Sequence, residues 1–137
     1  MSTLHLTALK AGLDAVLALG TPKLVFMSTG FTPSSTTHAY YSDISASVAS
    51  GTTAVTLSSV TTTIDTGNAR VEFDTADPSL STITASTNKY SIYVDTGTPA
   101  TSPVLATIDI VEGTLSPVSG TLAITVNAEG HFALKAV

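Results

Sequence analysis

The side chains that could take part in acid–base or nucleophilic chemistry are few. Three His residues are available as bases and the chain has no Cys, so thiolate catalysis, thiolate metal sites and disulfides are excluded. His38 has the most suggestive setting, because Tyr40, Tyr41 and Asp43 follow it closely. Covalent catalysis needs a nucleophile beside a positioned base, and no G-x-S-x-G elbow is present. We therefore expect a loop in which His38 and Asp43 bond to nearby backbone, with the two Tyr packed beside them.

The acidic residues also favour turns over a catalytic site. Asp65 and Asp95 each open an Asp-Thr-Gly triplet, the three letters that also occur in aspartic proteases. Asp bonds to its own backbone and Gly takes positive φ, so both triplets predict tight turns. Asp74 and Asp77 bracket another turn, but Ca²⁺ requires six to eight oxygen ligands. No phosphate-binding, dinucleotide-binding, zinc-protease or EF-hand motif occurs. We expect no enzyme, no cofactor, no metal site and no small-molecule substrate.

The composition limits the classes of partner. Only 11% of the residues are charged, the net charge is −5, and the five Lys and Arg stand singly along the chain. This pattern lacks the basic stripe that binds nucleic acid. Residues 4–19, the longest apolar-leaning stretch, are interrupted by His5, Lys10 and Asp14, which predicts neither a membrane span nor a signal peptide. Nearly a third of the residues are Ser or Thr, yet mean hydropathy is +0.38. Neutral hydroxyls on a charge-poor surface suit contact with another protein.

Hydrophobic periodicity predicts one helix and then only strands. Apolar residues recur at helical spacing within residues 4–19, Ser2 or Thr3 can cap the start, and Gly20 and Pro22 end the pattern. His5 falls at the helix start, and His131 lies beside a turn, which predicts surface positions for both.

From residue 23 the period changes to two. A slip of phase between Leu57 and Val60 predicts a bulge in a single strand, and residues 122–126 predict a hairpin with residues 132–136 across the turn 127–130. In residues 89–95, Tyr93 falls on the polar side. The predicted strands are 23–27, 55–64, 69–74, 89–95, 104–110, 122–126 and 132–136. We expect a single domain spanning 1–137, an antiparallel β-sandwich or barrel of about 6–8 strands with one N-terminal α-helix.

Several segments together resemble a family of small virion proteins of tailed bacteriophages. They are residues 23–27 (KLVFM), 32–44 (TPSSTTHAYYSDI), 71–77 (VEFDTAD), 92–98 (IYVDTGT), 101–109 (TSPVLATID) and 120–126 (GTLAITV). The resemblance implies a capsid cement (decoration) protein that sits on the outside of the assembled shell as a homotrimer. Its partners would then be its own copies and the major capsid protein, and its location the virion surface.

Two long loops are the segments we expect to touch the capsid or neighbouring subunits. The residues singled out in the first loop (residues 28–42) and just after it are Thr32, Pro33, His38, Tyr40, Tyr41 and Asp43. Those in the second, residues 95–103, are Thr96, Gly97, Thr98 and Pro99.

Two other functions fit the sequence. The first is a tail, neck or fibre-adaptor component of the same virion. The second is a carbohydrate-binding module that uses an exposed Tyr93, although the chain has no Trp.

Overall fold

A computed structural model describes residues 3–135, and within that range the chain forms nine strands in antiparallel sheets and two α-helices. The central sheet has four strands in the order β2-β1-β6-β7. Its strands are β1 (Thr21–Met27), β2 (Val55–Thr56), β6 (Lys89–Asp95) and β7 (Val104–Asp109). The mostly-β antiparallel class expected from the sequence is confirmed.

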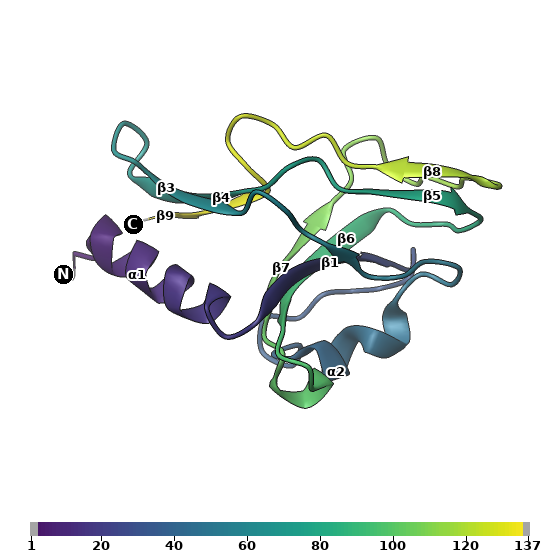
Figure 1. The fold of residues 1–137 in the computed structure, drawn as a ribbon, viewed down its shortest axis with the longest axis horizontal. Coiled ribbons are helices and arrows are strands. Elements are labelled where there is room, and N and C mark those ends of the chain that lie inside the picture. Colours follow the sequence, from purple (N-terminus) through teal and green to yellow (C-terminus); the bar gives the residue numbers. More distant parts are fainter. Residues whose placement is uncertain (1–2, 136–137) are drawn as a thin grey trace.

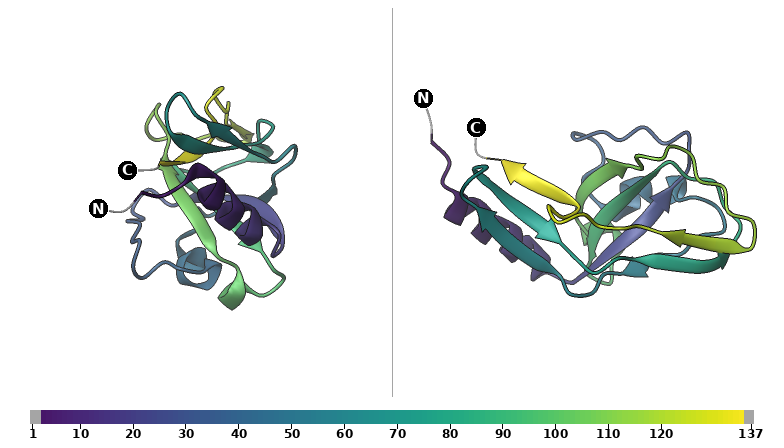
Figure 2. Two further views of the ribbon diagram at one scale, coloured as in Figure 1. Left: turned by 90° about the vertical axis from the view of Figure 1, so that its left-hand side faces the viewer. Right: turned by 90° about the horizontal axis from the view of Figure 1, so that it is seen from above.

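Two smaller sheets form the second layer. One has the order β3-β4-β9, and the other pairs β5 with β8. Figures 1 and 2 show these two sheets following one another along one face of the central sheet. The fold is therefore a sandwich whose second layer is split, with open edges in every sheet. The strands are β3 (Thr61–Asp65), β4 (Arg70–Asp74), β5 (Ser79–Ile83), β8 (Gly120–Ala123) and β9 (Phe132–Lys135).

The main core lies between the two layers. Apolar side chains of the central sheet, including Phe26 and Ile92, meet Val71, Phe73 and Leu122 of the second layer. A smaller cluster covers the other face of the central sheet. Its members are Val25, Met27, Phe31, Ile44 and Tyr93. The central sheet is thus buried on both faces, so the expectation that Tyr93 lies on a polar, solvent-facing side is wrong.

Helix α1 (Leu6–Leu17) agrees with the predicted N-terminal helix and packs beside β3 and β4 (Figure 1). The salt bridge of Lys10 with Asp14 measures 2.7 Å, and Thr62 of β3 donates a hydrogen bond to the other Asp14 oxygen at 2.6 Å. The hydrogen bonds from Lys10 and Thr62 lower the pKa of Asp14. The predicted cap is wrong in the described part of the chain, because the N-cap residue is His5 and not Thr3; Ser2 lies outside the described residues. Neither helix of the described chain is long and apolar enough to cross a membrane.

The predicted strand 55–64 is in fact two strands in different sheets. Val55 pairs with Leu24 of β1, whereas Thr62 pairs with Phe73 of β4. Between them Ser59 adopts a positive φ of 51°. The slip of phase therefore marks the passage from the central sheet to the second layer, and the expected bulge is wrong.

The predicted hairpin of residues 122–126 with 132–136 is also wrong. The turn at residues 127–130 exists, with the Gly130 amide bonded to the Asn127 carbonyl, but its two flanks enter different sheets. Leu122 pairs with Leu80 of β5, and Leu134 pairs with Val71 of β4. Strand β5 (Ser79–Ile83) is not among the predicted strands, and Ala136 lies outside the described residues.

Candidate functional site

The two predicted interaction loops come together beside the central sheet. The Tyr41 amide donates to the Ser102 carbonyl at 2.8 Å, and the Val104 amide donates to the Ala39 carbonyl at 3.0 Å. The short helix α2 (Tyr41–Ile44) lies against a 3₁₀ turn formed by Pro99–Thr101. Figure 1 shows this pairing below the central sheet. Segments some sixty residues apart therefore form one continuous surface, which we call the two-loop surface.

Internal hydrogen bonds fix the first loop. The Ser34 amide donates to Nδ1 of His38 at 3.0 Å, and the His38 ring stacks on Phe31 with centroids 5.2 Å apart. Asp43 accepts from the Ala39 and Tyr40 amides at 3.1 and 2.9 Å. The expectation that His38 and Asp43 bond to nearby backbone is confirmed. Both side chains shape the loop and make no nucleophile–base arrangement in the described residues.

The second loop is held in the same way. Asp95 accepts from the Gly97 amide at 2.9 Å and forms a 2.7 Å salt bridge with Lys23. The hydrogen bonds from Lys23 and Gly97 lower the pKa of Asp95. Asp65 likewise bonds to the Asn68 amide and side chain. Both Asp-Thr-Gly triplets are therefore turns, as predicted. The positive φ expected of their Gly is found at Gly97, whereas in the turn at Asp65 it falls on Ala69 (φ 51°) and not on Gly67.

The exposed part of the two-loop surface carries a single charged residue among those singled out, Asp43, whose carboxylate is bonded to two backbone amides. Tyr41 stacks on Tyr93 with ring centroids 4.2 Å apart, but Tyr40 has 45% of its surface exposed, so the expectation that both Tyr are packed is wrong for Tyr40. Because Tyr93 is only 3% exposed, burial raises the pKa of its hydroxyl. The exposed residues are Thr32, Pro33, Tyr40, Asp43, Gly97, Thr98 and Pro99, and the half-buried ones are His38, Tyr41 and Thr96. This surface can offer hydroxyls and one aromatic ring to another molecule.

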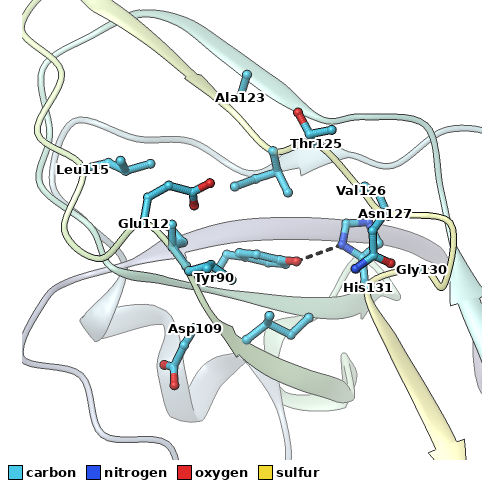
Figure 3. A pocket seen from close by; sticks show the side chains of 14 residues that line it. Tyr90, Asp109, Glu112, Leu115, Ala123, Thr125, Val126, Asn127, Gly130 and His131 are labelled. Carbon is cyan, nitrogen blue, oxygen red and sulfur yellow. Dashed lines mark hydrogen bonds between the residues drawn. The ribbon is translucent and has the colours of Figure 1, made fainter.

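A second site, which sequence reasoning missed, is a cleft of about 400 Å³ beside β6, β7 and the segment that leads from β8 to β9. At its floor His131 bonds to two hydroxyls. The Tyr90 hydroxyl oxygen lies 3.0 Å from Nδ1 and the Thr75 hydroxyl oxygen lies 2.8 Å from Nε2. The dashed line in Figure 3 marks the bond to Tyr90. His131 is 9% exposed, so its predicted surface position is wrong. One sequence signal could have revealed a buried polar partner here. The alternation places Tyr90 on the apolar face of its strand, and a buried Tyr hydroxyl needs a hydrogen-bond partner.

The hydrogen bonds around His131 indicate which of its two ring nitrogens carries the proton. The Thr75 hydroxyl donates to the Ala76 carbonyl at 2.8 Å, and a hydroxyl has only one proton to donate. Thr75 therefore accepts from Nε2–H of His131, which leaves Nδ1 of the neutral ring to accept from Tyr90. Burial lowers the pKa of His131, partly opposed by Asp74 and Asp77, and raises the pKa of Tyr90 to about 12. Both side chains are neutral at neutral pH.

Acidification is expected to weaken the fold through His131. The unfolded chain protonates this imidazole near pH 6.5, whereas the folded chain does so only at lower pH. The unfolded state binds more protons between those values, so the stability is fully present above pH 6.5 and decreases as the pH falls toward the folded pKa. Urea unfolding at about pH 7.5 and about pH 5.5 measures the change. His131→Gln should abolish most of this dependence and His5→Gln should retain it; the same dependence in both variants would contradict the assignment.

The two carboxylates of the acidic turn at residues 74–77 also accept hydrogen bonds from backbone amides. Asp74 accepts from the Thr75 amide at 2.8 Å and Asp77 from the Val126 amide at 2.9 Å. Within residues 3–135 no group of three or more His, Asp or Glu side chains could hold a metal ion.

Comparison with known proteins gave no family, since no protein-family model, curated protein or solved structure matches the chain.

Proposed function

We propose that this chain is a capsid cement protein of a tailed bacteriophage, which binds the outside of the assembled shell and stabilises contacts between capsid subunits without catalysis. The observation that carries the proposal is the two-loop surface. Two loops distant in sequence are joined there by backbone hydrogen bonds, and their charged side chains are engaged in internal bonds. The resemblance to phage virion proteins includes both loops.

The energetics of such a surface suit a protein that binds many equivalent sites. Neutral hydroxyls lose little hydration free energy when they are covered, because desolvated charges are the costly groups at interfaces. Tyr40 supplies the exposed aromatic ring, a residue type enriched among interface hot spots. The internal hydrogen bonds hold both loops before binding, which reduces the entropy lost on association. Several weak contacts then add through multivalency if the chain acts as a homotrimer.

The carbohydrate-binding alternative required an exposed Tyr93, which the structure does not provide. Tyr93 is buried under Tyr41 and cannot serve as a platform for a sugar ring. A tail, neck or fibre-adaptor role remains the competing proposal, and it differs in copy number, because a cement protein covers the shell whereas these components occupy one vertex or the tail.

Introducing a charge into the two-loop surface is expected to weaken binding to capsids by about tenfold, since an unpaired charge would have to be desolvated. Thr98→Glu is suited to this test, because the Thr98 side chain is exposed and makes no hydrogen bond through its hydroxyl within the described chain. Co-sedimentation with purified capsids over a concentration series measures the affinity.

The matched control is Thr121→Glu, which adds the same charge to an exposed Thr of β8 in the other layer. It should bind capsids as the unmodified chain does. Equal weakening by both variants would reject the two-loop surface as the binding face. A chain that never co-sediments with capsids would reject the cement proposal, and a few copies per particle would favour the tail alternative.

A further inference from the structure

The cleft above the Tyr90–His131 pair has the properties of a binding site for a small or slender ligand. Its volume of about 400 Å³ lies in the range of small-molecule pockets. Its apolar walls include Ile108, Ile110, Leu115 and Ile124. No Lys or Arg is among the lining residues, and its one His is neutral, so the charge in the cleft is entirely acidic.

The hydrogen-bond directions make the floor of the cleft an acceptor. Tyr90 gives its only proton to Nδ1 of His131, so its oxygen keeps a lone pair for a donor from the cleft. Tyr90 lines the cleft and is only 6% exposed, so water has little access to its side chain. A ligand group that donates hydrogen bonds is favoured there over one that only accepts them.

Two carboxylates border the cleft, and they differ in orientation. Figure 3 shows Glu112 reaching over the space beside the Tyr90 ring, whereas the Asp109 carboxylate points away from it. Neither forms an ion pair within residues 3–135. Glu112 is therefore the carboxylate placed to meet a cation at the mouth of the cleft.

We propose that this cleft binds a primary ammonium group carried on an aliphatic chain. The aliphatic chain packs against the isoleucines and Leu115, while the ammonium donates to the Tyr90 oxygen and the Glu112 carboxylate attracts its charge from the mouth of the cleft. The same chemistry is offered by a free alkylamine and by the Lys side chain of a partner protein. The inference does not rest on the proposed cement function, because it concerns the isolated chain.

The test is a titration of the isotope-labelled full chain, followed by NMR, with n-butylammonium, butanoate and butan-1-ol. These probes share an aliphatic chain and differ in the head group. We expect n-butylammonium to shift the resonances of Ile108 and Ile124 and to bind at least about fivefold more tightly than the other two, as a charge-assisted hydrogen bond allows. Equal or tighter binding of the alcohol or the carboxylate, or shifts confined to residues outside the cleft, would overturn the proposal.

Three variants locate the head group. Glu112→Gln should weaken n-butylammonium binding about threefold, because the attraction of an exposed carboxylate for the ammonium charge is lost. Tyr90→Phe should weaken it about tenfold, because a sheltered acceptor for a charged donor is lost. Asp109→Asn changes the charge equally on the side chain that points away, so it should leave the affinity within about twofold of the unmodified chain. The same loss in Asp109→Asn as in Glu112→Gln would show an unspecific effect of charge and reject the assigned geometry.

A lysine-containing peptide identifies the source of the ammonium. Nα-acetyl-lysine amide that shifts the same resonances as n-butylammonium would assign the cleft to a partner's Lys side chain, and a response to the free amine alone would assign it to a small molecule. Both results support the ammonium site. Capsid co-sedimentation is a separate experiment, so the NMR titration can be interpreted even if the cement proposal fails.

Discussion

Replacement of Phe73 by Ala is expected to lower the free energy of unfolding by about 3–5 kcal/mol, the usual cost of deleting a buried Phe. Phe73 is fully buried between the layers, stacks on Phe132 with centroids 5.0 Å apart, and lies 6.0 Å from the His131 ring. Deletion of the ring leaves a cavity where β4 meets the central sheet. Urea unfolding followed by circular dichroism measures the change in the midpoint at constant slope.

The control for this prediction is Val111→Ala. Val111 is almost fully exposed, so its truncation should change the stability by no more than about 0.5 kcal/mol. A cost at Phe73 as small as that at Val111 would mean that the second layer does not close over the central sheet as described. Domains of this size have a total stability of about 5–15 kcal/mol, so Phe73→Ala can bring the chain close to unfolding.

The second large effect is expected at Gly130, which precedes His131. Gly130 has a φ of +85°, and a Cβ atom there would overlap the backbone carbonyl of Phe73. That same carbonyl accepts the His131 amide at 2.8 Å. Gly130→Ala therefore combines left-handed strain with disturbance of a buried hydrogen bond, and should cost at least about 3 kcal/mol in total.

Gly97→Ala is the matched control for Gly130→Ala. Gly97 has nearly the same φ, +90°, but a Cβ atom there meets no other group. It should show only the conformational cost of about 1–2 kcal/mol. The difference between the two variants in thermal or urea unfolding measures the steric term alone, and equal costs would contradict the close approach of Gly130 to β4.

The sequence patterns predicted which residues form strands better than which strands pair. The predicted strand 69–74 is observed as β4, and turns are found at Asp65 and Asp95, where the Asp-Thr-Gly triplets predicted them. Pairing partners are not encoded in the alternation of apolar and polar residues, because backbone hydrogen bonds are alike for any neighbour. The hairpin expected between residues 122–126 and 132–136 was wrong for this reason.

The hydroxyl-rich composition hid part of the core. Ser91 lies on the face of β6 that the alternation assigned to solvent, yet it is fully buried and shares a 2.7 Å hydrogen bond with Thr107. Thr87 is also fully buried and donates to the Met27 carbonyl at 2.6 Å. A hydroxyl group can be buried when it is hydrogen-bonded. Ser and Thr in a sequence therefore do not indicate which face of a strand is exposed to solvent. The same ambiguity concealed the burial of Tyr93.

The two candidate sites were predictable to different degrees. The length and turn residues of the two loops marked them as surface segments, and the structure joins them. The cleft at Tyr90 and His131 depends on β9 pairing with β4, a contact across the whole second half of the chain. No local sequence pattern around His131 indicates the pairing of β9 with β4, and the residues beside His131 are typical of an ordinary turn.

The long-range partnership of β4 with β9 has a consequence for synthesis. A ribosome adds about 5–20 residues per second, so a nascent β4 waits several seconds before β9 is made. During that time the edge of β4 that pairs with β9 is without its final partner. In a chain with only 11% charged residues, β4 carries Arg70, Glu72 and Asp74 on one of its sides. Charges on a strand with an unpaired edge disfavour its pairing with the same strand of a neighbouring nascent chain.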